Sequence, residues 1–154
     1  MPDSELHIHF MQQALELARE AFDSDEVPVG ALCVLQGEVV GQGRNRVEER
    51  GDASAHAELL AIKQASERLN RWRLTDVTLY STLEPCIMCA GAIRLSRISH
   101  VVYGALDHRM GGFGSCVDLS QNKSLGPLTL VTGGILEDQS AEMLKSFFRM
   151  RRVD

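Results

Sequence analysis

The sequence of 154 residues contains no long apolar run, no internal repeat and no low-complexity tract. A membrane-spanning helix needs about 20 consecutive apolar residues, and no segment here approaches that length. The opening segment, MPDSELHIHF, has neither a basic leader nor an apolar core, so we expect no signal peptide. The four cysteines therefore do not suggest a disulfide framework. These absences favour a cytoplasmic protein that does not associate with membranes.

The length and composition are those of an ordinary globular protein. We expect residues 1–154 to form a single domain, because a chain of this size can bury roughly 70% of the surface that it exposes when unfolded. The chain is 44% hydrophobic and 24% charged, with a net charge of −5. An acidic balance gives no general attraction to nucleic acids, so any such contact must come from local clusters of cations.

The pattern of apolar residues predicts helices alternating with strands after an opening hairpin. Phe10, Ala14, Leu17 and Ala21 share helical spacing, with Ser4 as a candidate N-cap. Helices are expected over residues 4–22, 55–69, 85–95 and 138–151, and strands over residues 30–35, 38–41, 77–81, 100–104 and 128–131. This order predicts an α/β protein, a three-layer α/β/α sandwich around a central mixed five-stranded sheet.

Two short motifs carry the chemistry: His56-Ala57-Glu58 and Pro85-Cys86-Ile87-Met88-Cys89. Each lies at the expected start of a helix, where the positive end of the helix dipole favours a thiolate. One imidazole and two thiolates make three protein ligands, which leaves a fourth position for water, as in catalytic zinc sites. Glu58 lies two residues after the histidine and has the chemistry of a proton shuttle.

Each motif alone has other interpretations. A C-x-x-C pair also occurs in thioredoxin-like redox proteins and in structural zinc sites, but Cys33 and Cys116 are isolated and offer no second ligand pair. A histidine at a helix start is commonly a cap or a surface residue. The two motifs together, both at strand-to-helix junctions, favour a catalytic zinc site.

The combination of H-A-E with P-C-x-x-C resembles the signature of the zinc nucleoside and nucleobase deaminases. The whole chain is similar to the bacterial tRNA-specific adenosine deaminases, which have a cytidine deaminase-like fold. The resemblance extends to Glu26-Val-Pro-Val-Gly-Ala, Gly43-Arg-Asn-Arg-Val-Glu and Phe147-Phe-Arg-Met-Arg-Arg. Residues 108–113 depart from the family pattern, whereas Asp107 and Gly114-Ser115 align with it.

The resemblance implies a role for each matching residue. His56, Cys86 and Cys89 would bind one zinc ion per chain, and Glu58 would be catalytic. It also implies a homodimer that deaminates the wobble adenosine of a tRNA anticodon loop. The implied substrate-binding residues are Val29, Asn45, Ala57, Asp107, Phe148, Arg149 and Arg152.

Some features of the sequence are open to more than one interpretation. The last helix carries a cluster of cations, which could either contact RNA or only stabilise the helix through its dipole: Lys145, Arg149, Arg151 and Arg152. A second basic run surrounds Trp72. The adjacent residues Phe147 and Phe148 cannot share one helix face, so we expect one in the core and the other free to stack on a base.

Two alternative functions share the motifs. The first is deamination of a free cytidine, cytosine, guanine or deoxycytidylate, against which the basic closing helix and the Arg44-Asn45-Arg46 turn argue. The second is a non-catalytic zinc-stabilised RNA-binding module, in which Glu58 would have no use.

Overall fold

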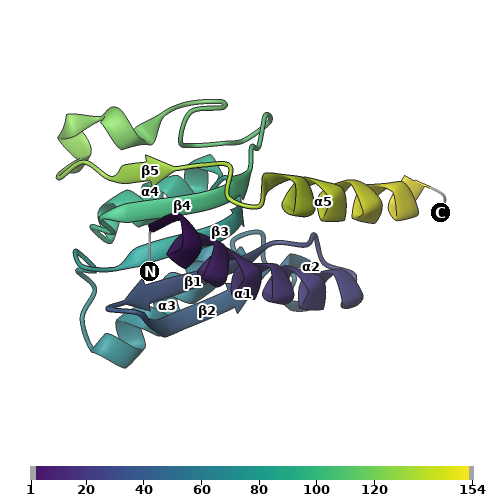
Figure 1. Ribbon diagram of the computed structural model, residues 1–154, viewed down its shortest axis with the longest axis horizontal. Helices are drawn as coiled ribbons and strands as arrows, with labels where there is room; N and C mark the ends of the chain where they lie inside the picture. Colours follow the sequence, from purple (N-terminus) through teal and green to yellow (C-terminus); the bar gives the residue numbers. More distant parts are fainter. Residues whose placement is uncertain (1–2, 153–154) are drawn as a thin grey trace.

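The computed structural model describes residues 3–152, and the side chains of Asp3 and Arg152 lie outside the described part. A five-stranded sheet forms its centre, in the order β2-β1-β3-β4-β5 (Figure 1). The strands are β1 (Gly30–Leu35), β2 (Glu38–Arg44), β3 (Thr78–Leu83), β4 (His100–Ala105) and β5 (Leu130–Thr132). Strand β1 is antiparallel to β2 and β3, whereas β3, β4 and β5 are parallel, so the sheet is mixed as expected.

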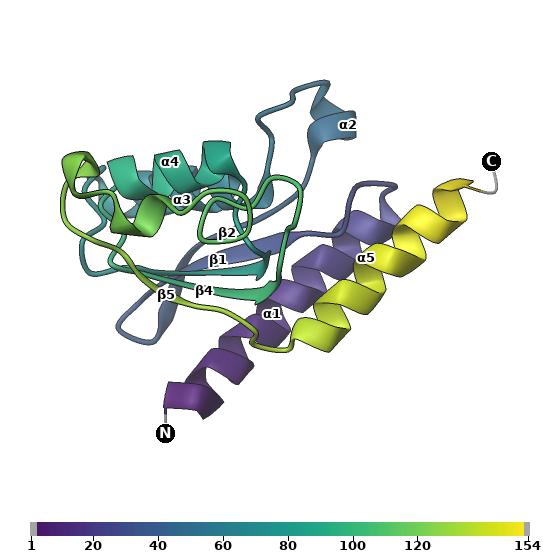
Figure 2. The ribbon, with the colours of Figure 1, turned by 90° about the horizontal axis from the view of Figure 1, so that it is seen from above.

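Helices cover both faces of the sheet, which confirms the predicted three-layer sandwich. Helices α1 (Asp3–Asp23) and α5 (Glu137–Arg152) lie on one face, and α3 (Ala57–Leu69) and α4 (Ile87–Leu95) lie on the other (Figure 2). The short elements are α2 (Val47–Arg50) and the 3-10 turns η1 (Leu119–Gln121) and η2 (Lys123–Leu125). No helix within residues 3–152 has the length and apolar character needed to cross a membrane.

Strand β1 supplies apolar side chains to both halves of the core, because successive residues of a strand point to opposite faces. Ala31 and Cys33 pack in the cluster beneath α3 and α4. Leu32 and Val34 pack in the cluster beneath α1, with Phe10, Met11, Tyr80 and Val102. Burial raises the pKa of the Cys33 thiol to about 12, as expected of an inert core cysteine.

The predicted hairpin is confirmed, and glycines in its second strand seat α3. Gln36 and Gly37 both have positive φ, at 49° and 80°, which is the geometry of a tight hairpin turn. A Cβ added to Gly41 would lie 2.3 Å from the Ala61 carbonyl oxygen, and one added to Gly43 would lie 2.6 Å from that of Ala57. Side chains at these two positions would push away the helix that carries His56 and Glu58 at its start.

Several predicted boundaries were wrong. Ser4 lies inside α1 and is not its N-cap. The helices expected from residues 55 and 85 begin two residues later, at Ala57 and Ile87. Strand β2 continues to Arg44, and β5 begins at Leu130. Helix α2, which the sequence analysis did not anticipate, follows β2 and ends at Gly51 with positive φ.

Candidate active site

Helices α3 and α4 begin two residues later than predicted, so the first expected metal-binding residue of each motif is the N-cap of its helix. His56 is the N-cap of α3 and has extended backbone angles. Cys86 is the N-cap of α4, and its sulfur accepts a hydrogen bond from the backbone N–H of Cys89 at 3.5 Å. A sulfur in this position takes the place of the side-chain oxygen that usually caps a helix. The first turns of both helices thus meet at one point.

The three expected metal ligands lie together. The Nδ1 atom of His56 lies 3.5 Å from the Cys86 sulfur and 3.4 Å from the Cys89 sulfur. Their ligand atoms all lie within 4.8 Å of one another, and they are the only group of three or more His, Cys, Asp or Glu residues within residues 3–152 so arranged. One imidazole and two sulfurs suit zinc, which tolerates mixed nitrogen and sulfur ligands. The residues present therefore fit this metal.

The two sulfurs have opposite proton affinities when they face each other without a metal. A hydrogen bond from the Cys89 thiol, supported by another from His56, lowers the pKa of Cys86 to about 4. The same contact with Cys86, together with burial, raises the pKa of Cys89. A metal ion bound here would hold both sulfurs as thiolates, since thiolates are the binding form.

Glu58 is the buried acid beside this cluster. It is only 4% exposed, and burial raises its pKa to about 7. The positive charge of His56 opposes that rise without cancelling it. A carboxyl group with a pKa near neutrality can both accept and release a proton under physiological conditions.

We call residues 45–51, which contain helix α2, the α2 turn. A pocket of about 440 Å³ opens beside the ligand cluster, between the α2 turn and α5. Figure 2 shows both of these elements projecting beyond the same end of the sheet. The walls of the pocket combine acidic and apolar side chains with one arginine. The lining residues are Asp25, Glu26, Val27, Val29, Asn45, Val47, Glu48, His56, Ala57, Glu58, Leu83, Glu84, Cys86, Asp107, Phe147, Phe148 and Arg151.

Asn45 is held firmly in this wall. Its Nδ2 donates to the Val27 carbonyl oxygen at 3.2 Å, and its Oδ1 accepts from the Val47 N–H at 3.2 Å. A side-chain amide has two N–H donors and two acceptor lone pairs. One donor and one acceptor site of Asn45 therefore remain available to a ligand in the pocket.

The structure places most of the expected substrate-binding residues at the pocket. Val29, Asn45, Ala57, Asp107 and Phe148 line it. Arg149 does not; its guanidinium donates to Glu142 and Ser146 of the same helix. The Arg152 side chain lies outside the described residues. Of the adjacent aromatics, Phe147 is buried and Phe148 is 45% exposed, as the sequence predicted.

Arg151, Glu26 and Glu84 line the pocket but are absent from the expected substrate-binding set, although Arg151 was among the expected RNA-contacting cations and Glu26 lies in a motif of the family resemblance. Arg151 lies over the Phe147 ring, 4.6 Å from its centroid, and donates to the Asp25 carbonyl oxygen. The other two, Glu26 and Glu84, are each 1% exposed. Their burial could not be read from neighbouring residues, because it depends on contacts with distant segments.

Glu84 organises the loop formed by residues 107–115. Its carboxylate accepts hydrogen bonds from the backbone N–H groups of Asp107, Phe113 and Ser115 at 3.1–3.2 Å, and from the Ser115 hydroxyl. A Cβ on Gly111 would lie 2.4 Å from this carboxylate, so the loop can close around it only with glycine there. These contacts hold the loop in place and keep Asp107 at the pocket.

Comparison with a family model defines the class of protein. Residues 4–105, which carry both motifs, match the zinc-binding region of cytidine and deoxycytidylate deaminases. The chain therefore belongs to this family of zinc-binding deaminases, and its relatives specify the branch. They are tRNA-specific adenosine deaminases.

One such relative, from Streptococcus pyogenes serotype M1, is 41% identical over 99% of this chain and 90% of its own. Another, from Agrobacterium fabrum, is 44% identical over 95% of this chain and 96% of its own.

Solved structures of related proteins have the same fold as this chain. A structure from studies of A-to-I editing by tRNA:A34 deaminases at the wobble position of transfer RNA superposes with a TM-score of 0.85 at 44% identity. It matches 88% of this chain and 99% of its own. A guanine deaminase from Nitrosomonas europaea superposes with a TM-score of 0.77 at 26% identity, over 89% of this chain and 81% of its own.

Proposed function

We propose that this protein hydrolyses adenosine to inosine at the wobble position of a tRNA anticodon, with residues 1–154 acting as one zinc-dependent deaminase domain. The observation that carries the proposal is the position of Glu58, a buried carboxyl group in the pocket wall beside the His56, Cys86 and Cys89 cluster. A structural zinc site would have no use for it. Relatives that are 41–44% identical over nearly the whole chain support the choice of substrate.

In this proposal His56, Cys86 and Cys89 hold the metal. When bound, zinc supplies an acidified water that is nucleophilic at neutral pH. Glu58 takes a proton from the attacking water as the water oxygen bonds to C6 of the adenine. The carboxyl group then passes that proton to the ring nitrogen. Glu58 then takes the remaining proton of the hydroxyl added at C6 and gives it to the exocyclic amine as the C6–N bond breaks. Adenosine and water thereby give inosine and ammonia.

The remaining pocket residues would hold the base. Asn45 would use its free donor and acceptor on the purine edge, and Val29 and Ala57 would pack against the ring. Asp107 and the exposed ring of Phe148 would contact the nucleotides beside it. Arg149 and Arg152 would contact phosphates farther out on α5. An anticodon loop suits such a pocket because its bases are already unpaired and can turn outwards at little cost.

The deciding experiment compares substrates. The zinc-loaded protein should form inosine in an anticodon stem-loop RNA with adenosine at the wobble position. It should act far more slowly on free adenosine, cytidine or guanine, and on the same adenosine within a duplex. Equal turnover of a free nucleoside or base would contradict the RNA assignment.

We also propose that the protein acts as a cytoplasmic homodimer. Ile87, Met88 and Leu95 expose apolar side chains along α4, and these side chains would be covered in a dimer. Light scattering after gel filtration tests this, and a monomer at micromolar concentration would contradict it.

A further inference from the structure

A second hollow lies on the reverse side of the α2 turn. Its volume is about 290 Å³, and it runs between α3 and the edge strand β2. Asn45, Val47 and Glu48 of the turn line the active-site pocket, whereas Arg46 and Arg50 line this second hollow. The turn is therefore a thin wall between the two.

The second hollow is basic. Arg46, Arg50 and Lys63 line it, and Glu67, one helical turn beyond Lys63, is the only acidic residue in its lining. We call the hollow the basic groove and define it by these three cations. Gln64 accepts a hydrogen bond from the backbone N–H of Gln42 at 2.8 Å and so joins α3 to β2 within the lining.

Two of these cations make no direct polar contact within the described residues, and the charge interaction of Arg50 is a minor one with Asp52. The side chains of Arg50 and Lys63 form no hydrogen bond or ion pair with any residue in the described range 3–152. Most other arginines are engaged: Arg149 binds Glu142, and Arg71 binds Asp76. An acidic protein that leaves two neighbouring cations unpaired in one hollow has local charge available for an anionic ligand.

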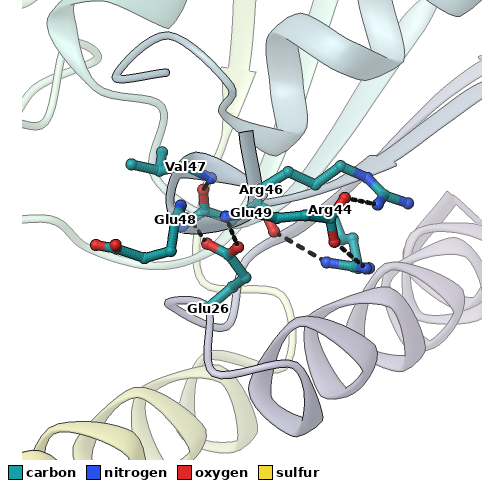
Figure 3. A network of polar contacts seen from close by, with 7 residues as sticks. Glu26, Arg44, Arg46, Val47, Glu48 and Glu49 are labelled. Atoms are coloured by element: carbon teal, nitrogen blue, oxygen red, sulfur yellow. Dashed lines mark hydrogen bonds and ion pairs between the residues drawn. The ribbon is translucent and has the colours of Figure 1, made fainter. Parts of the chain in front are cut away.

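The backbone that presents Arg46 and Arg50 is fixed from beneath (Figure 3). The buried Glu26 carboxylate accepts hydrogen bonds from the N–H groups of Glu48 and Glu49 at 2.9 and 2.7 Å. Glu49 in turn bridges Arg44 and Arg46, at 3.1 and 2.5 Å. The turn is therefore preorganised, and little conformational entropy remains to be lost when a ligand binds.

The location of the groove indicates which anion it takes. A base that enters the active-site pocket leaves its sugar and phosphates at the pocket mouth, between α5 and the α2 turn. On the α5 side Arg151 lines the pocket, and on the other side only the α2 turn separates the pocket from the groove. We propose that the basic groove binds backbone phosphates of the RNA strand that flanks the target base. This inference rests on the proposed function and extends its binding site.

The test uses the full-length zinc-loaded protein and an anticodon stem-loop RNA. The variant carries Arg50→Gln and Lys63→Gln, which remove exposed side chains that make no direct polar contact in the described part of the chain, so we expect normal folding. The control carries Arg19→Gln and Lys123→Gln, which change the net charge equally but line neither the pocket nor the groove. A third variant, Arg50→Lys with Lys63→Arg, keeps both charges. The affinity is measured at several salt concentrations, together with the single-turnover rate at saturating RNA.

We expect the groove variant to bind RNA roughly three- to tenfold more weakly at moderate salt. The slope of log affinity against log salt should fall by about 1.4, or about 0.7 for each lost phosphate contact with a single strand. The single-turnover rate should be unchanged, and both the control and the charge-keeping variant should bind like the unmodified protein.

Unchanged affinity and slope in the groove variant would overturn the proposal, and so would an equal loss in the control. The proposed function is judged separately, by inosine formation in the unmodified protein. If inosine forms while the groove variant binds normally, the groove assignment alone fails.

Discussion

The Nδ1 atom of His56 lies 3.4 Å from the sulfur of Cys89, although 33 residues separate them in the sequence. Strand β3 lies between them in the chain, and each residue belongs to the first turn of a different helix. The ligand group therefore exists only when α3 and α4 are both packed against the sheet. Its chemistry is a property of the folded chain.

The first prediction concerns the metal. We expect about one zinc per chain by elemental analysis, and Cys89→Ser should lose both the metal and the activity, because an alcohol is a far poorer zinc ligand than a thiolate. Cys116→Ser is the matched control, since Cys116 is exposed and lies outside the ligand group. Full zinc content in Cys89→Ser would mean that the ligands are misassigned.

The second prediction separates binding of the metal from catalysis. Glu58→Gln should lower the rate of inosine formation by about 10²- to 10⁴-fold, the usual contribution of a positioned acid–base group. Its zinc content should be unchanged, because Glu58 is outside the ligand set. Loss of zinc in this variant would assign the side chain to the metal, and normal turnover would show that the proton moves by another route.

The third prediction concerns Glu84. In Glu84→Gln an amide NH2 group, which donates and cannot accept, would replace one of the oxygens that accept backbone N–H groups. We expect the free energy of unfolding to fall by on the order of 1–3 kcal/mol, since a buried donor then lacks its acceptor. Glu38→Gln, at an exposed position of the edge strand β2, should change the free energy of unfolding by less than about 0.5 kcal/mol. Urea denaturation measures both, and equal stability of the two variants would show that the 107–115 loop does not depend on Glu84.

The fourth prediction distinguishes two neighbouring aromatics. Phe147→Ala should reduce the unfolding free energy by about 3–5 kcal/mol, because the ring is buried and its removal leaves a cavity. Phe148→Ala should leave stability nearly unchanged but weaken RNA binding by about 1–3 kcal/mol, the usual value of a base stacked on an aromatic ring. If Phe148→Ala bound RNA normally, its ring would have no role in stacking.

The fifth prediction compares the arginines of α5. Arg151→Gln should weaken RNA binding more than Arg149→Gln, because Arg151 lines the pocket whereas Arg149 is paired with Glu142. Fluorescence anisotropy with a labelled stem-loop gives both affinities. A greater loss of affinity in Arg149→Gln than in Arg151→Gln would mean that the RNA contacts α5 away from the pocket.

The sequence was most informative where function depends on neighbouring residues. The spacing of His56 with Glu58, and of Cys86 with Cys89, predicts their grouping because each pair lies on one helical turn. Alternation in β1 and the Gln36-Gly37 turn likewise predict local geometry. The family resemblance supplied Asn45 and Val29, which local patterns do not single out.

The features that escaped prediction depend on distant contacts. Glu26 and Glu84 look like surface residues in the sequence, yet backbone N–H groups from 22–31 residues away surround their carboxylates. The choice between Arg149 and Arg151 depends on how α5 is rotated against α1. The start of α4 was set too early because a sulfur cap is not among the usual helix-start signals. The start of α3 was set too early because its N-cap, His56, makes no side-chain capping hydrogen bond and is not a usual capping residue.

Because the ligands come from two helices, a bound metal ion would stabilise the fold as well as take part in catalysis. An ion held by His56, Cys86 and Cys89 ties the starts of α3 and α4 together, and the unfolded chain offers no such preformed site. By mass action, free zinc at about a thousand times its dissociation constant would stabilise the folded state by about 4.1 kcal/mol. Thermal unfolding should therefore act as a gauge of metal supply, and a chelator should lower the melting temperature before any RNA is present. A cell short of zinc would lose this protein to unfolding and degradation as well as to inactivity.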